Sequence, residues 1–260
     1  MARAVIDYRH IAWILGGFLA LLVLSMLFPL GFDLVTRHRP PDHFVDAIGI
    51  TAGVAIVLLV AGYRESQPNL GQRDGILLVV LIWLSACLFG ALPLYFSDYY
   101  DAFFESASGF TTTGATVLDV VESLSPEIQL WRALSHWLGG MGIVLLSIAI
   151  LPLIGQGGRD LYRAEFSGAR SEQLKPRVIE ASQTLWKIYL TLTVALFASL
   201  MLAGMGTLDA ICHAFSTLAT GGFSTRTASI GAFDDPVIEY IIIIFMLLAG
   251  VSFVQQYKLW

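Results

Sequence analysis

The chain has 260 residues, of which 56% are hydrophobic and 13% are charged. Because the apolar residues come in long runs, the sequence predicts an integral membrane protein of the helical kind. It excludes a transmembrane β-barrel, a cleaved signal peptide and a disulfide-stabilised domain. The net charge of −5 is uninformative as a total, and we expect no nucleic acid among the partners.

Six segments are long and apolar enough to cross a membrane. A helix needs about 20 apolar residues to span a hydrocarbon core about 30 Å thick. Runs without Asp, Glu, Lys or Arg cover residues 11–30, 76–97, 133–158 and 188–208. We predict crossings at residues 11–31, 44–62, 75–96, 129–154, 185–206 and 237–255.

The charges of the loops predict the orientation. Basic residues lie in segments 2–10, 63–74 and 156–182, whereas segment 98–129 has six acidic residues and no Lys or Arg. Because basic loops stay in the cytoplasm, we expect the N-terminus there and segment 98–129 outside. Arg37 and Arg39, in an external loop of this scheme, oppose it.

A short apolar segment at residues 101–110 separates the third and fourth crossings. Ten helical residues rise about 15 Å, so this segment is expected to enter the membrane and return, followed by the sequence TTTGAT. Non-helical backbone at that depth is tolerated where it lines a water-filled cavity. A half-helix followed by such backbone is typical of an ion filter, in which carbonyl oxygens replace the hydration shell of the ion.

The same element occurs twice. DAFFESASGFTTTGAT, from Asp101, aligns without gaps with DAICHAFSTLATGGFS, from Asp209. The identical pairs are Asp101/Asp209, Ala102/Ala210, Ser108/Ser216, Thr112/Thr220 and Gly114/Gly222, and Gly142/Gly250 follow at the same offset. We predict an all-α membrane protein with a leading transmembrane hairpin (1–70), a first pore repeat (71–158), a basic cytoplasmic loop (159–182) and a second pore repeat (183–260). Each repeat is a helix, a re-entrant half-helix and a helix, as in potassium channels.

Several motifs resemble the Trk/Ktr/HKT superfamily of cation transporters, most closely its bacterial TrkH/TrkG potassium-uptake type. They run from about residue 98 to 256 and read DAFFESASGFTTTGATV, LWRALSHWLGGMGIVLLSIAILPLIGQGG, LYRAEFSG, KPRVIEASQTLWKIYLTLT, STLATGGFST and LLAGVSF. The resemblance implies a multi-pass protein of the bacterial inner membrane, whose pore has four repeats. This chain has two, so we expect a truncated pore subunit or two copies assembled as a homodimer.

The filter positions are expected at Thr112, Thr113 and Gly114 and, in the second repeat, at Thr220, Gly221 and Gly222, with Ala115 and Phe223 as secondary candidates. The resemblance implies that a filter glycine goes with potassium, whereas a serine in the first repeat resembles sodium-preferring plant members. We therefore predict K+ as the transported ion, alone or by symport with a coupling ion. We expect no cofactor and no catalytic residue in this chain.

Ionisable residues near the half-helices have two interpretations each. Glu105 and His213 occupy equivalent places, and they either act on the ion or hold the half-helix by hydrogen bonds. Asp101 and Asp209 are expected to cap the N-termini of the half-helices. Arg226 is either an exposed charge or a group that repels excess cations.

The next helix carries further candidates. Gly139, Gly140 and Gly142 either pack tightly or form a hinge. Arg132, together with Lys187 in the following crossing, is expected to extend to the membrane interface.

The basic residues at 159–177 are a topological signal, a site for anionic lipid or, as the resemblance implies, a docking site for a cytoplasmic nucleotide-binding subunit of the TrkA type. Three alternatives to a Trk-type pore stay open. One is a sodium-coupled Ktr-type subunit, which generally lacks the leading hairpin. Another is a non-conducting truncated product that pairs with full-length subunits. The last is a membrane enzyme using His136, Glu105 and His213, although these lack any known metal-binding spacing.

Overall fold

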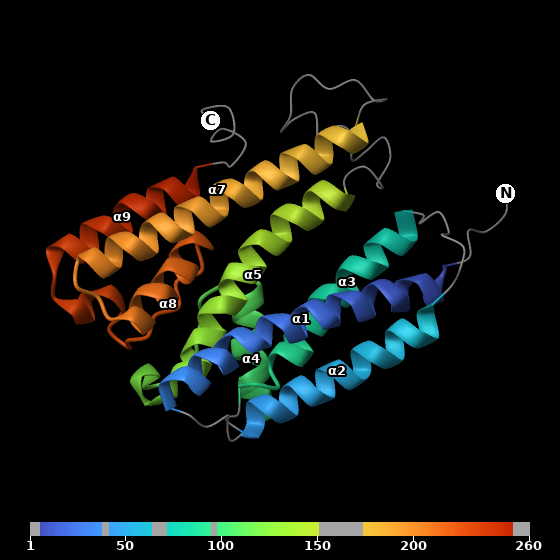
Figure 1. Cartoon of the computed structure of the whole chain (residues 1–260), viewed down its shortest axis with the longest axis horizontal. Coiled ribbons are helices and arrows are strands. Elements are labelled where there is room, and N and C mark those ends of the chain that lie inside the picture. The colour runs from blue at the N-terminus through green and yellow to red at the C-terminus, as the bar shows by residue number, and fades with distance from the viewer. Residues whose placement is uncertain (1–5, 38–41, 64–71, 95–97, 151–173, 252–260) are drawn as a thin grey trace.

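The computed structural model describes residues 6–37, 42–63, 72–94, 98–150 and 174–251. Within these ranges all regular secondary structure is helical (Figure 1). The α-helices are α1 (Tyr8–Arg37), α2 (Asp42–Gly62), α3 (Gln72–Gly90), α4 (Tyr99–Phe110), α5 (Pro126–Ile150), α7 (Leu174–Leu202), α8 (Thr207–Leu218) and α9 (Pro236–Gly250). Two short 3-10 helices, η1 (Val121–Ser123) and η2 (Ser229–Phe233), follow the half-length helices α4 and α8.

The predicted crossings coincide with α1, α2, α3, α5, α7 and α9. In the described part of the chain, four stretches are long and apolar enough to span a membrane: Tyr8–Thr36, Asp42–Gly62, Arg73–Gly90 and Gln183–Leu202. The all-helical, multi-pass membrane protein expected from the sequence is thus confirmed. Most of the basic loop, residues 159–173, and the end of the last crossing lie outside the described residues, and α7 begins at Leu174 inside the segment predicted as loop.

The long helices are apolar on their outward faces as well as their inward ones. Only 22% to 33% of the residues in each of the four spans are buried inside the protein. Leu21, Val60 and Leu247 are among the large side chains that point outward, with 63%, 72% and 68% of their surfaces exposed. Such helices are stable only where hydrocarbon replaces water around them, which makes the lipid bilayer the medium of this fold.

Small residues hold the hairpin of α1 and α2 together. A Cβ atom at Gly16 would meet Leu59, and one at Gly62 would meet the backbone of Trp13, so both glycines allow close approach of the helices. The buried hydroxyl of Thr51 donates to the carbonyl oxygen of Ala47 at 2.7 Å, so burial does not leave this polar group without a partner.

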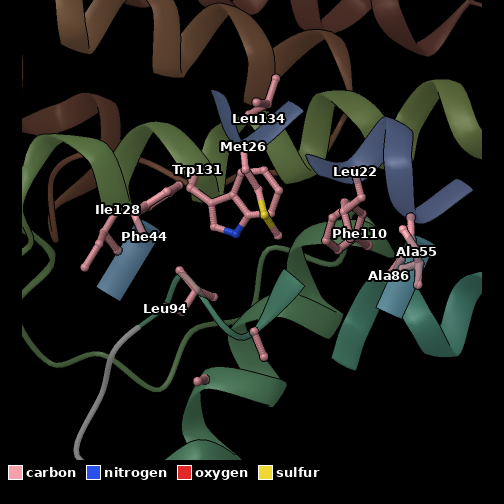
Figure 2. Packing of buried hydrophobic residues seen from close by; sticks show 13 residues of the cluster. Leu22, Met26, Phe44, Ala55, Ala86, Leu94, Phe110, Ile128, Trp131 and Leu134 are labelled. Carbon is pink, nitrogen blue, oxygen red and sulfur yellow. The ribbon is translucent and has the colours of Figure 1, made fainter. Parts of the chain in front are cut away.

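Helix α5 lies between two halves of the molecule (Figure 1), with α1, α2 and α3 on one side and α7 and α9 on the other. Figure 2 shows Trp131 of α5 at the centre of the first hydrophobic core, beside Met26. The Trp131 indole nitrogen donates to the carbonyl oxygen of Gly90 at 2.8 Å, and the Phe44 and Phe110 rings meet the indole edge to face. Further along α5, Met141 belongs to a second core with α7, α8 and α9. The two short helices are therefore fixed against one shared helix.

Candidate ion-filter site

The short helices α4 and α8 have the same length, 12 residues, and end in the same hydrogen-bonded turn. In the first, the Thr112 N–H donates to Gly109 at 3.0 Å and the Thr113 N–H to Ser108 at 2.9 Å. The equivalent bonds of the second turn fall at the offset of the sequence repeat: Thr220 to Thr217 at 3.0 Å and Gly221 to Ser216 at 2.9 Å. The two turns thus have the same pattern of backbone hydrogen bonds.

Left-handed backbone occurs at equivalent positions of both turns. Thr112 and Thr220 have φ angles of 54° and 55°, and Gly114 and Gly222 have φ angles of 75° and 98°. A β-branched residue in this region is a rare and strained choice that costs about 1–3 kcal/mol. Its occurrence twice, at the offset of the sequence repeat, shows that the surrounding structure imposes this conformation on both turns.

The two turns touch each other through their glycines. A Cβ atom at Gly114 would overlap the carbonyl oxygen of Gly221, and a Cβ atom at Gly221 would overlap the imidazole of His136. Gly222 has open space where its Cβ would be, so it is needed for its φ angle alone. The first turn, the second turn and α5 therefore pack without room for one additional carbon atom.

The candidate residues are arranged around this contact. Thr113, Ala115, Thr220 and Gly222 are exposed, whereas Gly221 and Phe223 are buried, and Thr112 and Gly114 lie between these extremes. A cavity of about 380 Å³ adjoins the second turn, lined by residues 220–223 and by side chains of α8, η2 and α9. Both turns thus present main-chain atoms to open space.

Glu105 of α4 holds the chain that leaves the first turn. Its Oε1 accepts a hydrogen bond from the Val117 N–H at 2.8 Å and another from the Thr116 hydroxyl. Its Oε2 accepts from Nε of Arg132 at 2.9 Å, and the two side chains are 0% and 2% exposed. The prediction that Arg132 extends to the interface is wrong, because its buried carboxylate partner on α4 holds it inside.

His213 of α8 holds the second turn in the equivalent way. Its Nδ1 lies 2.7 Å from the carbonyl oxygen of Asp209, and since a carbonyl only accepts, Nδ1 carries the proton. Its Nε2 then accepts from the hydroxyl of Ser224 at 3.0 Å, and Ser224 is the repeat equivalent of Thr116. Glu105 and His213 both make the hydrogen bonds expected of residues that hold the half-helices.

Asp209 is occupied by side chains that follow the second turn. It accepts hydrogen bonds from the Thr225 hydroxyl and from Nη2 of Arg226, the latter at 3.0 Å. Arg226 is therefore an ion-paired residue with a side chain 42% exposed, and not a free surface charge.

The prediction that Asp101 and Asp209 are N-caps is wrong. The N-cap of α4 is Asp98, whose carboxylate accepts from the Tyr100 N–H at 3.0 Å, and the N-cap of α8 is Gly206. Asp101 and Asp209 lie inside their helices, in the first turn. A negative charge there interacts favourably with the helix dipole but does not cap a backbone N–H.

One face of α5 supports both turns. Gly139 lies so close to α4 that a Cβ atom there would overlap the carbonyl oxygen of Phe110, and a Cβ atom at Gly140 would lie 3.0 Å from the Cα atom of Ala219, a tight contact. Gly142 has no such neighbour. Tight packing therefore explains the first two of these glycines.

His136 and Phe223 join α5 to the second turn. The two rings stack with centroids 4.0 Å apart, and His136 Nδ1 lies 3.0 Å from the Ser216 hydroxyl, which also accepts from the Gly222 N–H at 3.1 Å. No sequence signal had connected His136 to the second turn, because Ser216 and Phe223 belong to the other repeat, far along the chain.

The loops beyond the turns also meet. The Glu122 carboxylate accepts from the Thr227 N–H at 2.8 Å and from its hydroxyl at 2.6 Å, and the Thr227 hydroxyl also accepts from the Val121 N–H at 3.0 Å. The hydrogen bonds from Thr227 lower the pKa of Glu122. These bonds give the two repeats a further connection besides the contact between the turns and the contacts of α5.

No group of three or more His, Cys, Asp or Glu side chains that could hold a metal ion occurs among the described residues. Glu105, His136 and His213, the residues of the enzyme alternative, each bind a different structural partner. The polar groups of the site thus fix backbone beside two half-length helices, an arrangement that is typical of membrane transport proteins.

Comparison with known proteins places the chain in a family. The family model described as "TrkH: Cation transport protein" matches residues 47–260. The Trk system potassium uptake protein TrkH of Salmonella typhimurium is 42% identical over 258 residues, covering 97% of this chain and 53% of that protein. TrkG of Escherichia coli is 40% identical over 200 residues, covering 75% of this chain and 41% of that protein.

A solved structure agrees with these matches. The potassium transporter TrkH from Vibrio parahaemolyticus superposes with a TM-score of 0.81 at 36% identity, covering 96% of this chain and 51% of that one. The chain belongs to the TrkH family of cation transport proteins, which confirms the resemblance to the TrkH/TrkG type predicted from its motifs. This is a family of transport proteins and not of enzymes. It spans about half the length of the relatives that it matches.

Proposed function

We propose that residues 112–114 and 220–222 are two segments of a selectivity filter through which K+ crosses the membrane. The observation that carries the proposal is the pair of turns with equal backbone geometry, in contact through Gly114 and Gly221. Transport of potassium by the related TrkH and TrkG proteins supports the choice of ion.

The length of the short helices supports a re-entrant path. Twelve helical residues rise about 18 Å, too little to cross a hydrocarbon core of about 30 Å. The C-terminal end of each helix carries a partial negative charge, and the turn that could bind a cation follows that end directly. Main-chain carbonyl groups in a fixed geometry then replace the water lost by the ion.

Two filter segments surround only part of an ion, and an ion that loses water without full replacement is costly. We therefore propose that further segments complete the ring, supplied by a second copy of the chain or by a longer subunit with which it pairs. The α1–α2 hairpin and the TrkH, TrkG and TrkI relatives favour the Trk type over the sodium-coupled Ktr type.

The orientation in the bacterial inner membrane is also part of the proposal. The N-terminus and the basic loop 159–182 would lie in the cytoplasm, where a regulatory subunit of the TrkA type would bind. Asp119, an exposed residue, would lie outside. A cysteine at Asp119 should react with an impermeant external reagent, and the native Cys87 and Cys212 are buried and give little background. Labelling only from the cytoplasmic side would reverse the orientation.

Gly114→Ser tests the filter. The serine side chain would overlap the Gly221 carbonyl oxygen at a φ of 75°, so the two turns must move apart. In the complete transporter that contains these residues, the ratio of Rb+ to Na+ uptake should fall roughly tenfold, equivalent to about 1.4 kcal/mol. Gly53→Ser, at a glycine of α2 with open space around it, is the control and should leave the ratio unchanged. An unchanged ratio for Gly114→Ser, at normal abundance in the membrane, would contradict the filter assignment.

A further inference from the structure

One buried arginine contacts both repeats. Arg132 of α5 is 2% exposed, and Glu105, its ion-pair partner from α4, is 1% exposed. A buried charge is costly unless it is paired and hydrogen-bonded, and replacing such a pair by apolar groups often stabilises a protein. Stability alone therefore does not explain the Glu105–Arg132 pair, and its contacts indicate its role.

On the side of the first repeat, the guanidinium group fixes the chain that leaves the turn. Nε donates to Oε2 of Glu105 at 2.9 Å, and Nη2 lies 3.3 Å from the Thr116 hydroxyl. The other carboxylate oxygen binds Thr116 and the N–H of Val117. These residues begin two positions after Gly114, so the pair determines where the first turn ends.

On the side of the second repeat, the same guanidinium group lies over an aromatic ring. Its Cζ is 4.1 Å from the centroid of Phe223, the residue directly after Gly222. His136, one helical turn further along α5, stacks on Phe223 as well. The ring is thus held by two planar groups of α5, and with it the end of the second turn.

From these contacts we infer that Arg132 is a positioning residue for ion selectivity, which fixes the distance between the two filter turns by binding Glu105 behind the first and Phe223 behind the second. The inference rests on the proposed filter function and adds the residue that sets the distance between the two turns. An arginine suits this place because its planar group donates in the carboxylate plane and stacks on a ring at the same time, whereas the compact ammonium group of lysine does not.

The second repeat offers a matched control. The His213–Ser224 hydrogen bond occupies the place of the Glu105–Thr116 bond and, in contrast to the Arg132–Phe223 contact, connects two residues of the same repeat. Its loss in Ser224→Ala should loosen the second turn without changing the contact between Arg132 and the first.

The test uses two variants designed to keep the protein folded. Phe223→Leu removes the ring and leaves the ion pair, and the double variant Glu105→Gln/Arg132→Met removes both charges together, so that neither is left buried alone. Hydrogen exchange is measured for peptides that contain residues 116–117 and 222–226, in the purified protein. The ratio of Rb+ to Na+ uptake is measured in the complete transporter.

We expect Phe223→Leu to raise exchange at residues 116–117, in the other repeat, and both variants to lower the uptake ratio roughly tenfold. Ser224→Ala should raise exchange at 222–226 only, and Gly53→Ser, at a glycine of α2 with open space around it, should leave both measurements as in the wild type. Unchanged exchange at 116–117 in Phe223→Leu, or an unchanged ratio in folded protein, would overturn the inference. If the wild type itself shows no preference for Rb+, the proposed function fails, and the exchange result alone decides whether Arg132 couples the turns.

Discussion

The two repeats share a backbone but differ in the side chains that support it. Both turns have threonine at a φ near 55° and, two positions later, glycine at a larger positive φ. Behind them, the first repeat has a buried ion pair, Glu105–Arg132, whereas the second has a neutral His213–Ser224 bond. The backbone conformation of the turns is thus common to both repeats. The side chains that bind the residues after each turn differ between them.

The supports also differ in reach and exposure. Arg132 is buried and contacts both repeats, whereas Arg226 binds Asp209 within the second repeat with a side chain 42% exposed. Breaking the exposed pair should cost only about 0–1 kcal/mol, whereas removing one partner of the buried pair leaves an unpaired buried charge and costs more. Changes in the first repeat should therefore have larger effects than equivalent changes in the second, except where α5 presses on the second turn.

That exception gives the largest expected effect. The repeat alignment pairs Thr113, which is exposed, with Gly221, which lies against His136. Gly221→Thr copies the first repeat into the second and would force the whole threonine side chain into the imidazole ring, so we expect no folded protein by size-exclusion chromatography. The reciprocal Thr113→Gly should fold and cost about 1 kcal/mol at most, through backbone entropy. Normal folding of Gly221→Thr would show that α5 does not confine the second turn.

Replacing the side chain that supports each turn, Glu105 or His213, should give a smaller and unequal effect. Glu105→Gln leaves Arg132 buried without its carboxylate, which typically costs about 3–5 kcal/mol. His213→Gln removes a neutral hydrogen bond and should cost about 0.5–1.5 kcal/mol. Thermal unfolding of the two purified variants compares them, and equal destabilisation would show that the two supports are energetically the same.

The smallest effect concerns the contact between the loops that follow the two turns. Thr227 lowers the pKa of Glu122 by hydrogen bonds, so the carboxylate form is favoured in the folded state. The resulting stabilisation is present at neutral pH and is lost as the pH falls from the ordinary glutamate pKa, about 4.3, through the lower folded value. Glu122→Gln should therefore lower Tm slightly at pH 7 and not at a pH below the folded pKa. A difference that grows on acidification would contradict this assignment.

The positions of the membrane helices and the repeat could be predicted because both depend on short, continuous segments of the sequence. Long apolar runs coincide with α1, α2, α3, α5, α7 and α9, and the repeat offset found from five identities reappears in the φ angles of the turns. The contacts of Arg132 with both turns could not be predicted, because Arg132 meets Glu105 and Phe223 from elements well separated in the chain. Nothing near Arg132 in the sequence signals either partner.

The sequence by itself determined that this is a helical membrane protein with two half-length helices that each end in a Thr/Gly turn. Apolar run length, glycine content and an internal repeat can be read from short segments. The bilayer then limits the structures that such segments can form, because every backbone polar group inside it needs a hydrogen-bond partner. The tertiary structure alone decided that the two turns touch at Gly114 and Gly221, and that one arginine of α5 joins them. Such contacts depend on how α4, α5 and α8 pack, which is set by the shapes of all three helices together.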